Sequence, residues 1–248
     1  MKSAADNAAS RITVELIKGM LNATRREMEA LIARTAMSPF IREKKDFFTA
    51  ILNPAGELVV STSLTLASNL VDAIIEQYPA DIMQDGDLFW YNDPYTTGGA
   101  VSHLPDMVFV MPVFAENRLL AFIECWGHLW DIGGAVPGSI SPTASSVFLE
   151  GVMIPPVRVL HGGVRNEEVV RIFTRNSRFP DMLEGDLNSL MAACNLGCKR
   201  LEECAALHGA DALENAFEAI ISQTETALQQ QISAHIPEGS WAFRDRID

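Results

Sequence analysis

The residues of this sequence best suited to chemistry form two His-x-x-Asp units, His103 with Asp106 and His128 with Asp131. Each unit follows an apolar or irregular segment rather than a helical pattern. Imidazole nitrogens and carboxylate oxygens suit a divalent metal where strands meet loops, because the strand fixes the donors while the loop leaves room for a substrate. The two units therefore predict a metal site.

The strands around these units indicate how the donors come together. Apolar runs predict a strand over residues 107–114 and a partner strand over residues 119–126, joined by a short turn. His103 and Asp106 precede the first strand, and His128 follows the second. In an antiparallel pair these positions share one edge, so we expect the three donors at one end of a sheet.

A structural explanation competes with this interpretation. One His-x-x-Asp unit is a weak signal, because an imidazole hydrogen-bonded near a strand start gives the same pattern, but two units that flank one hairpin favour the metal. Asp131 is predicted to be catalytic, with the alternative that it orients an imidazole or a loop amide. His161, His208 and His235 have no such neighbours and are predicted to lie on the surface.

Glycine pairs occur beside both units, at residues 98–99 and 133–134, but neither matches a nucleotide-binding pattern with its following helix. A Gly-x-Ser-x-Gly nucleophile motif is also absent, so hydrolysis by this chain is expected to depend on a metal. Residues 133–146 are rich in Gly, Pro and Ser and too long for a plain connector, which predicts a binding loop.

Composition narrows the classes of protein. The 248 residues include 48% hydrophobic residues, enough for a substantial core, and the net charge is −13 with 19 scattered Lys and Arg residues. A phosphate-tracking groove is not expected, so no nucleic-acid partner is predicted. Asp6 and Arg11 interrupt the N-terminal sequence, and the apolar runs are only strand-sized. We therefore predict a cytoplasmic enzyme that has no membrane partner.

The four cysteines are ambiguous. Cys125 falls in an apolar strand, and Cys194, Cys198 and Cys204 fall on one predicted helix. Cys194 and Cys198 are four residues apart and could form a metal or redox pair. Buried reduced cysteines that pack as small hydrophobic residues are the favoured alternative.

The remaining elements define the fold class. Helices are predicted over residues 10–37 with Ser10 as N-cap, 66–78, 166–174, 185–209 and 210–236, and strands over residues 46–52, 57–63, 88–91 and 157–160, with another strand starting at Pro237. Asp46 opens the first strand, where a carboxylate can also be a simple strand-end cap. We expect one α+β domain over residues 1–248, in which a mixed or antiparallel sheet carries the site between an N-terminal helix and a helical C-terminal third.

Five blocks, in this order and over nearly the whole chain, resemble the hydantoinase B/oxoprolinase family. They are DFFTAILNPAGELV, NDPY…GG…HLPDM, GHLWDIGG, EGVMIPPVRV and NSRFP…GDLNSLMAACNLGCKRLEE. That family includes B-type subunits of ATP-dependent N-methylhydantoinases, oxoprolinases and caprolactamase, and related subunits of acetone and acetophenone carboxylases. The resemblance implies a hetero-oligomer with an A-type ATPase subunit, which binds ATP and phosphorylates a carbonyl oxygen of a lactam, hydantoin or ketone.

The resemblance also implies a ligand set. The metal ligands of the family correspond to Asp46, His103, Asp106 and His128, so Asp46 joins the predicted site. A B-type subunit completes the reaction at this divalent metal. Two carboxylates and two imidazoles admit either Zn or Mn.

Two departures from the family pattern lie beside the predicted site. The loop between Tyr95 and His103 is longer than in the common NDPYxGGTHLPD pattern, and Leu129 and Trp130 replace a histidine and a small residue of the common HHADIGG pattern. A more aromatic and less basic pocket favours an aromatic or bulky substrate. Both changes leave hydrolase and carboxylase open.

Three functions therefore stay open at this point. The first is the metal-binding part of an ATP-dependent cyclic-amide hydrolase subunit, and the second is a subunit of an ATP-dependent ketone carboxylase. The chain has about half the usual length of a B-type subunit and ends on a predicted strand without a partner. We therefore expect an N-terminal portion of a longer subunit, and the third candidate is an inactive assembly module.

Overall fold

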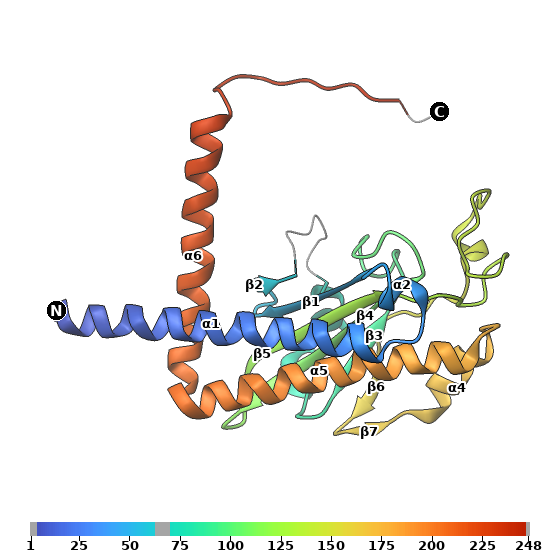
Figure 1. Cartoon of the computed structure of the whole chain (residues 1–248), viewed down its shortest axis with the longest axis horizontal. Helices are drawn as coiled ribbons and strands as arrows, with labels where there is room; N and C mark the ends of the chain where they lie inside the picture. The colour runs from blue at the N-terminus through green and yellow to red at the C-terminus, as the bar shows by residue number, and fades with distance from the viewer. Residues whose placement is uncertain (1–3, 63–69, 247–248) are drawn as a thin grey trace.

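The computed structural model describes residues 4–62 and 70–246, which form an α+β fold with one antiparallel sheet (Figure 1). The strands are β1 (Phe47–Leu52), β2 (Leu58–Ser61), β3 (Leu88–Tyr91), β4 (Asp106–Ala115), β5 (Arg118–His128), β6 (Val157–His161) and β7 (Val164–Arg165). The helices are α1 (Ala4–Thr35), α2 (Pro39–Arg42), α3 (Asp72–Gln77), α4 (Glu167–Arg175), α5 (Pro180–His208) and α6 (Ala210–His235), with short 3₁₀ turns η1 (Ala80–Ile82) and η2 (Val147–Leu149). The predicted fold class is confirmed, and the single-domain organisation stays a prediction.

The centre of the sheet is the predicted hairpin. The strand order is β2-β1-β5-β4-β3-β6-β7, and every neighbouring pair is antiparallel. Glu116 and Asn117 join β4 to β5 with positive φ angles of 52° and 61°, the backbone of a two-residue hairpin turn. This register places Asp106 opposite His128, so the ends of β4 and β5 meet at one edge of the sheet.

The two faces of the sheet bury different cores, because alternate side chains of a strand point to opposite faces. Ile123 and Cys125 of β5 belong to the larger core, which α1 and α5 cover. Figure 1 shows these two long helices lying across the same face of the sheet. Phe122 belongs to the smaller core on the other face, where Val71 and Ile74 from the region of α3 pack.

Close packing of α1 against α5 depends on glycine at one contact. A Cβ added at Gly197 would lie 2.8 Å from the Met28 sulfur and 2.9 Å from Ile123. Asp186 of α5 fixes the end of α1, because its Oδ1 accepts hydrogen bonds from the backbone N–H groups of Met37 (2.7 Å) and Ser38 (3.0 Å). The connection from α1 to α2 is therefore held against α5.

Several predicted boundaries were wrong. Helix α1 begins at Ala4, so Ser10 lies inside the helix and does not cap it. Helix α5 begins at Pro180 rather than at residue 185, since proline at the first helical position loses no helical hydrogen bond. The short α2 and the two-residue β7 were not predicted. Within the predicted helix over residues 66–78 the structure has α3, and residues 66–69 lie outside the described part of the chain.

The predicted strand starting at Pro237 does not form, and this prediction was wrong. Residues 237–246 have no strand pairing with any part of the chain that the structure describes. Apolar residues such as Trp241 and Phe243 give a strand-like pattern, but a strand needs a neighbouring ladder of hydrogen bonds. Figure 1 shows this segment running away from the end of α6, and 72% of Trp241 and 91% of Phe243 are exposed.

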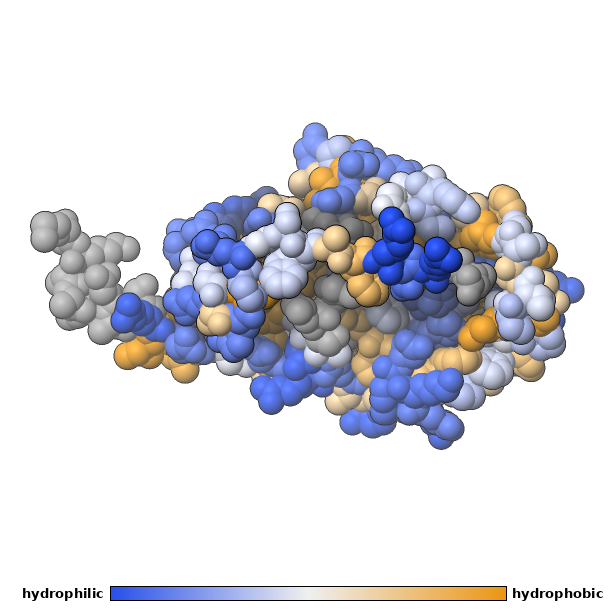
Figure 2. Space-filling model, turned by 90° about the horizontal axis from the view of Figure 1, so that it is seen from above, coloured by the Kyte–Doolittle hydropathy of each residue, from blue (hydrophilic) through white to orange (hydrophobic). Residues whose placement is uncertain are grey.

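The surface seen in one view is mainly polar (Figure 2). Seen from above, the described residues are mostly hydrophilic, with hydrophobic residues in small separate groups (Figure 2). Of the helices within residues 4–62 and 70–246, none combines the length and apolar character needed to cross a membrane.

The four cysteines are free and buried. The sulfur of Cys194 lies 3.3 Å from the sulfur of Cys125, across the contact between α5 and β5. Burial raises the pKa of the Cys125 and Cys198 thiols well above the usual value. These thiols are therefore protonated at neutral pH and pack as small hydrophobic side chains.

Candidate metal centre

The ends of three strands bring the candidate ligands to one edge of the sheet. His128 is the last residue of β5, Asp106 is the first of β4, and Asp46 directly precedes β1. The backbone N–H of His128 donates to the carbonyl of Asp46 (3.0 Å), and the N–H of Leu129 donates to the carbonyl of Pro105 (2.9 Å). These bonds continue the sheet past its last ladder pairs, so the donors are held by backbone rather than by a free loop.

Three side chains converge at this edge. His103 Nε2 lies 3.1 Å from His128 Nδ1 and 3.5 Å from Asp106 Oδ1, and His128 Nδ1 lies 3.2 Å from Asp106 Oδ1. Within the described residues, this is the one group of at least three His, Cys, Asp or Glu side chains with the proximity needed to hold a metal ion. The structure thus brings together three of the four predicted ligands.

The geometry of this trio fits a divalent cation. Two ligand atoms that each lie about 2.1 Å from a cation, at an angle of about 90 to 110°, are about 3.0 to 3.4 Å apart. Two of the observed separations, 3.1 and 3.2 Å, lie in this range, and the third, 3.5 Å, is just above it. Two imidazole nitrogens and a carboxylate oxygen are donors that both zinc and manganese accept. The residues therefore fit the metal that the sequence predicts.

Asp46 lies at the margin of the trio. Its Oδ2 is 4.0 Å from His128 Nδ1, and 42% of its side chain is exposed. The residue before it, Lys45, has a positive φ of 60°, a conformation uncommon for residues other than glycine. The structure thus places the fourth predicted ligand beside the other three, on their solvent-exposed side.

The turn that carries His103 is fixed on several sides. The Ser102 hydroxyl lies 3.0 Å from His103 Nδ1. In the tautomer whose Nδ1–H donates to this hydroxyl, Nε2 carries no proton and can act as a metal ligand. The next peptide, at Leu104, donates its N–H to Glu150 Oε2 (2.9 Å) and accepts at its carbonyl from Asn92 Nδ2 (2.8 Å). Asn92 is fully buried, so the turn is anchored to the protein interior.

His128 is positioned differently, by packing. Its ring centroid lies 4.7 Å from that of Phe40, and Phe40 lies 5.1 Å from the ring of Trp130. The Nε2 atom of His128 is buried and has no hydrogen-bond partner among the described residues. The orientation of this imidazole therefore depends on its aromatic neighbours together with the contacts of Nδ1 to Asp106 and His103.

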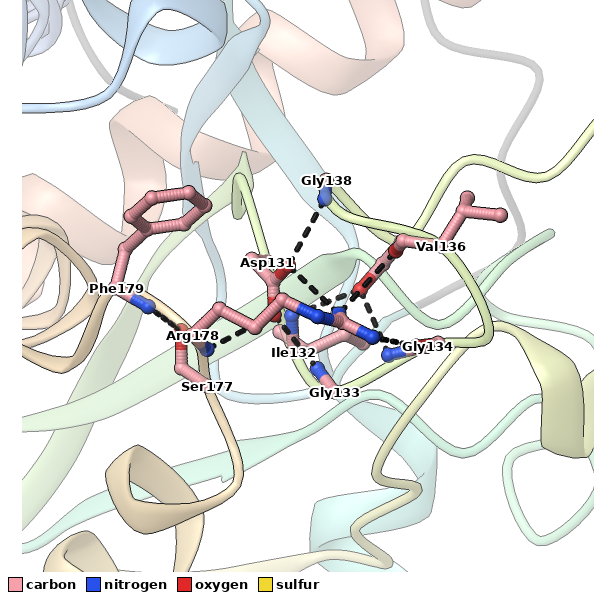
Figure 3. A network of polar contacts seen from close by, with 10 residues as sticks. Asp131, Ile132, Gly133, Gly134, Val136, Gly138, Ser177, Arg178 and Phe179 are labelled. Carbon is pink, nitrogen blue, oxygen red and sulfur yellow. Dashed lines mark hydrogen bonds and ion pairs between the residues drawn. The ribbon is translucent and has the colours of Figure 1, made fainter.

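Asp131, the predicted catalytic residue, lies in a separate network (Figure 3). Its Oδ1 accepts from the backbone N–H groups of Gly133 (3.1 Å) and Arg178 (3.3 Å). Its Oδ2 accepts from the N–H of Gly138 (2.9 Å) and from Arg178 Nη1 (2.9 Å). Burial of Asp131 opposes ionisation, but the hydrogen bonds from Gly138, Arg178 and Gly133 outweigh burial and lower the pKa of the carboxyl. Its catalytic role stays a prediction, and these contacts favour the alternative of orienting loop amides.

Sequence reasoning missed the residues that support the site. Arg178, Asn92, Glu150 and Phe40 act through backbone groups or ring packing, which leave no spacing pattern along the chain. Three of the blocks that resemble the family contain Asn92, Glu150 and Arg178, respectively. Their place in these blocks was the one sequence feature that could have marked them as important to the site. Phe40 offered none.

The antiparallel sheet and its covering helices make this an α+β protein. The imidazole and carboxylate groups at one edge of the sheet form a candidate divalent-metal centre. The sequence profile of the hydantoinase B/oxoprolinase family matches residues 10–248. The chain belongs to this family.

Known relatives agree with this assignment. The caprolactamase subunit beta of Pseudomonas jessenii is 30% identical over 244 residues, which are 95% of this chain and 41% of that subunit. The crystal structure of the ATP-dependent caprolactamase from the same organism superposes with a TM-score of 0.84 at 29% identity, over 92% of this chain and 40% of that one. The acetophenone carboxylase delta subunit of Aromatoleum aromaticum is 28% identical over 82% of this chain and 30% of that subunit. The chain thus spans less than half the length of these relatives.

Proposed function

We propose that this chain forms the metal-binding part of a B-type subunit in an ATP-dependent cyclic-amide hydrolase of the hydantoinase and oxoprolinase type. In this proposal an A-type ATPase subunit binds ATP and phosphorylates the carbonyl oxygen of a lactam or hydantoin. The present chain completes ring opening on that activated substrate, and the two subunits form a hetero-oligomer.

One observation carries the proposal, which is the convergence of His103, Asp106 and His128 within a chain of the hydantoinase B family. With Asp46 they would hold a zinc or manganese ion. When bound, such an ion supplies Lewis acidity that polarises a substrate oxygen or lowers the pKa of a water molecule. The relatives named for caprolactamase support the cyclic-amide class.

The exposure of the ligand side chains indicates the direction from which substrate approaches. Asp46 and His103 expose 42% and 37% of their side chains, whereas His128 exposes 6%. We therefore propose that substrate approaches from the side of Asp46 and His103, with buried His128 at the back. Phe40 and Trp130 form an aromatic wall beside His128, which supports a preference for aromatic or bulky substrates.

Reconstitution with an A-type ATPase subunit tests the proposal. The mixture would be given ATP, a divalent metal and one of several cyclic amides, including 5-phenylhydantoin, and ring-opened product would be measured by mass spectrometry. We expect ATP-dependent ring opening that His128→Ala reduces at least about a hundredfold, as for loss of a group central to catalysis. His235→Ala, at an exposed histidine on α6, is the matched control and should leave the rate unchanged. Equal rates in both variants would contradict the proposal.

The similarity to the acetophenone carboxylase delta subunit supports a second candidate, a ketone carboxylase subunit. Bicarbonate separates the two functions, because carboxylation consumes it and hydrolysis does not. ATP turnover that requires a ketone together with bicarbonate would favour the carboxylase. Turnover with a lactam in bicarbonate-free buffer would favour the hydrolase.

A further inference from the structure

One arginine from a distant part of the chain fastens the loop that follows His128 (Figure 3). Arg178 lies between α4 and α5. Its Nη1 donates to Asp131 Oδ2 (2.9 Å) and to the carbonyl of Val136 (3.2 Å), and its Nη2 donates to the carbonyl of Gly134 (2.7 Å). We call this set of bonds the Asp131–Arg178 clamp. It ties both ends of the segment 131–136 to one guanidinium group.

The Asp131 carboxylate is fully engaged in this clamp. Its side chain has no exposed area, and each oxygen accepts two hydrogen bonds. A carboxylate has about four lone-pair positions, so Asp131 has no acceptor site left for a substrate proton. The contacts of this carboxylate therefore act on the loop and on Arg178.

The loop needs such a restraint. Gly133, Gly138 and Ser139 all have positive φ angles, of 87°, 85° and 61°. For Ser139 this backbone conformation is unfavourable and persists only when surrounding contacts hold it. Its hydroxyl accepts from the N–H groups of Ile132 (2.9 Å) and Gly134 (3.0 Å), so the loop closes on itself once the clamp has set its ends.

A series of neighbouring residues leads from the clamp to the metal centre. Gly138, whose N–H is bound by Asp131, faces Trp130 closely enough that a Cβ added to it would be in van der Waals contact, 3.7 Å from the Trp130 carbonyl oxygen and 3.8 Å from its ring. Trp130 packs on Phe40, and Phe40 packs on His128. His128 Nδ1 lies 3.2 Å from Asp106 Oδ1, but Nε2 has no hydrogen-bond partner among the described residues. Packing by Phe40 is therefore a second restraint on the angle of this imidazole.

We infer that Arg178 is a positioning residue, which fixes the loop at residues 133–139 through Asp131 and thereby holds Trp130 and Phe40 against the imidazole of His128. The inference deepens the proposed function and rests on it only where His128 acts as a metal ligand. The effect of Arg178 on the orientation of the His128 ring exists in the metal-free chain and can be tested without metal or partner.

The test uses the full chain with Arg178→Ala and a matched control, Arg165→Ala. Arg165 also bridges to a neighbouring element, through Asn188 and Glu184 of α5, but does not contact the loop. The ring resonances of the five histidines would be recorded by ¹H–¹³C NMR and assigned with His→Gln variants. We expect Arg178→Ala to shift or split the His128 resonance and leave that of His235 in place, whereas Arg165→Ala should leave both unchanged.

Chemical rescue distinguishes positioning from general loss of structure. Since 40% of the Arg178 side chain is exposed, its removal opens a site that free guanidinium can enter. Low concentrations of guanidinium, below those that unfold proteins, should return the His128 resonance toward its wild-type position in Arg178→Ala only. If Arg178→Ala does not fold, Arg178→Lys keeps the charge but loses the forked geometry, and the same shift of the His128 resonance is expected.

Zinc titration of the same variants separates this inference from the proposed function. We expect about tenfold weaker binding in Arg178→Ala, the lower end of the effect of removing a residue that orients a ligand. A loop that becomes sensitive to protease while the His128 resonance and zinc affinity stay at wild-type values would overturn the inference. A shifted His128 resonance in a chain whose wild-type form binds no metal would support positioning and contradict the proposed function.

Discussion

Glu124 provides the sharpest prediction about stability. It lies near the middle of β5, opposite Ala50 on β1 and Val110 on β4. Only 1% of the residue is exposed, and its Oε1 has no hydrogen-bond partner within the described residues. Burial raises the pKa of its carboxyl from 4.5 to about 8. At neutral pH the folded chain therefore keeps a proton that the unfolded chain releases.

The sign and size of the effect follow from this difference. Between the unfolded pKa of 4.5 and the folded pKa of about 8, the folded state binds one more proton than the unfolded state. The free energy of unfolding therefore falls as pH rises, by about 1.4 kcal/mol per pH unit. The contribution of Glu124 is fully present below the unfolded pKa and lost as pH rises through the folded pKa, a total of roughly 5 kcal/mol.

Glu124→Gln tests this reasoning, because glutamine has nearly the same shape and does not titrate. Urea unfolding would be measured from about pH 5 to about pH 8.5, the interval over which linkage predicts the change. We expect the variant to gain stability relative to wild type by up to about 4 kcal/mol across this interval. Glu116→Gln, on the exposed turn of the same hairpin, should show no such trend. A difference between Glu124→Gln and wild type that does not change with pH would refute the reasoning.

Three further predictions concern residues around the site and the core. Ser102→Ala should weaken zinc binding by about tenfold, because the hydroxyl that orients His103 is lost; calorimetry that shows unchanged affinity would contradict this. Asn92→Ala should lower the free energy of unfolding by about 2 to 4 kcal/mol, since buried Asn92 makes three hydrogen bonds to backbone groups; a loss within about 0.5 kcal/mol in urea unfolding would mean that these bonds contribute little. Cys125 and Cys194 should react with a thiol reagent only after unfolding, because both are buried, and fast labelling of the native chain would contradict their packing.

Short-range patterns predicted the part of the fold that positions the site. The turn residues Glu116 and Asn117 and the two apolar runs beside them define β4 and β5, and the antiparallel register then places Asp106 opposite His128. His103 follows from its distance of three residues to Asp106. For these three side chains, proximity in space is a direct consequence of local sequence.

Contacts between distant segments could not be predicted in this way. Arg178 reaches Asp131 from 47 residues away, and Glu150 reaches Leu104 from 46 residues away. Each is one polar residue among many, and its partner is a backbone group or a carboxylate already assigned another role. The strand predicted from Pro237 failed for the related reason that apolar alternation records a tendency, whereas a strand also requires a neighbour.

The most direct test of the account is the metal content of the purified chain, measured by mass spectrometry for wild type, His103→Ala and the exposed control His235→Ala. The account predicts close to one zinc or manganese ion per chain in wild type and in His235→Ala, and loss of that ion in a folded His103→Ala chain. Stoichiometric metal that persists when both His103 and His128 are replaced by alanine would contradict it.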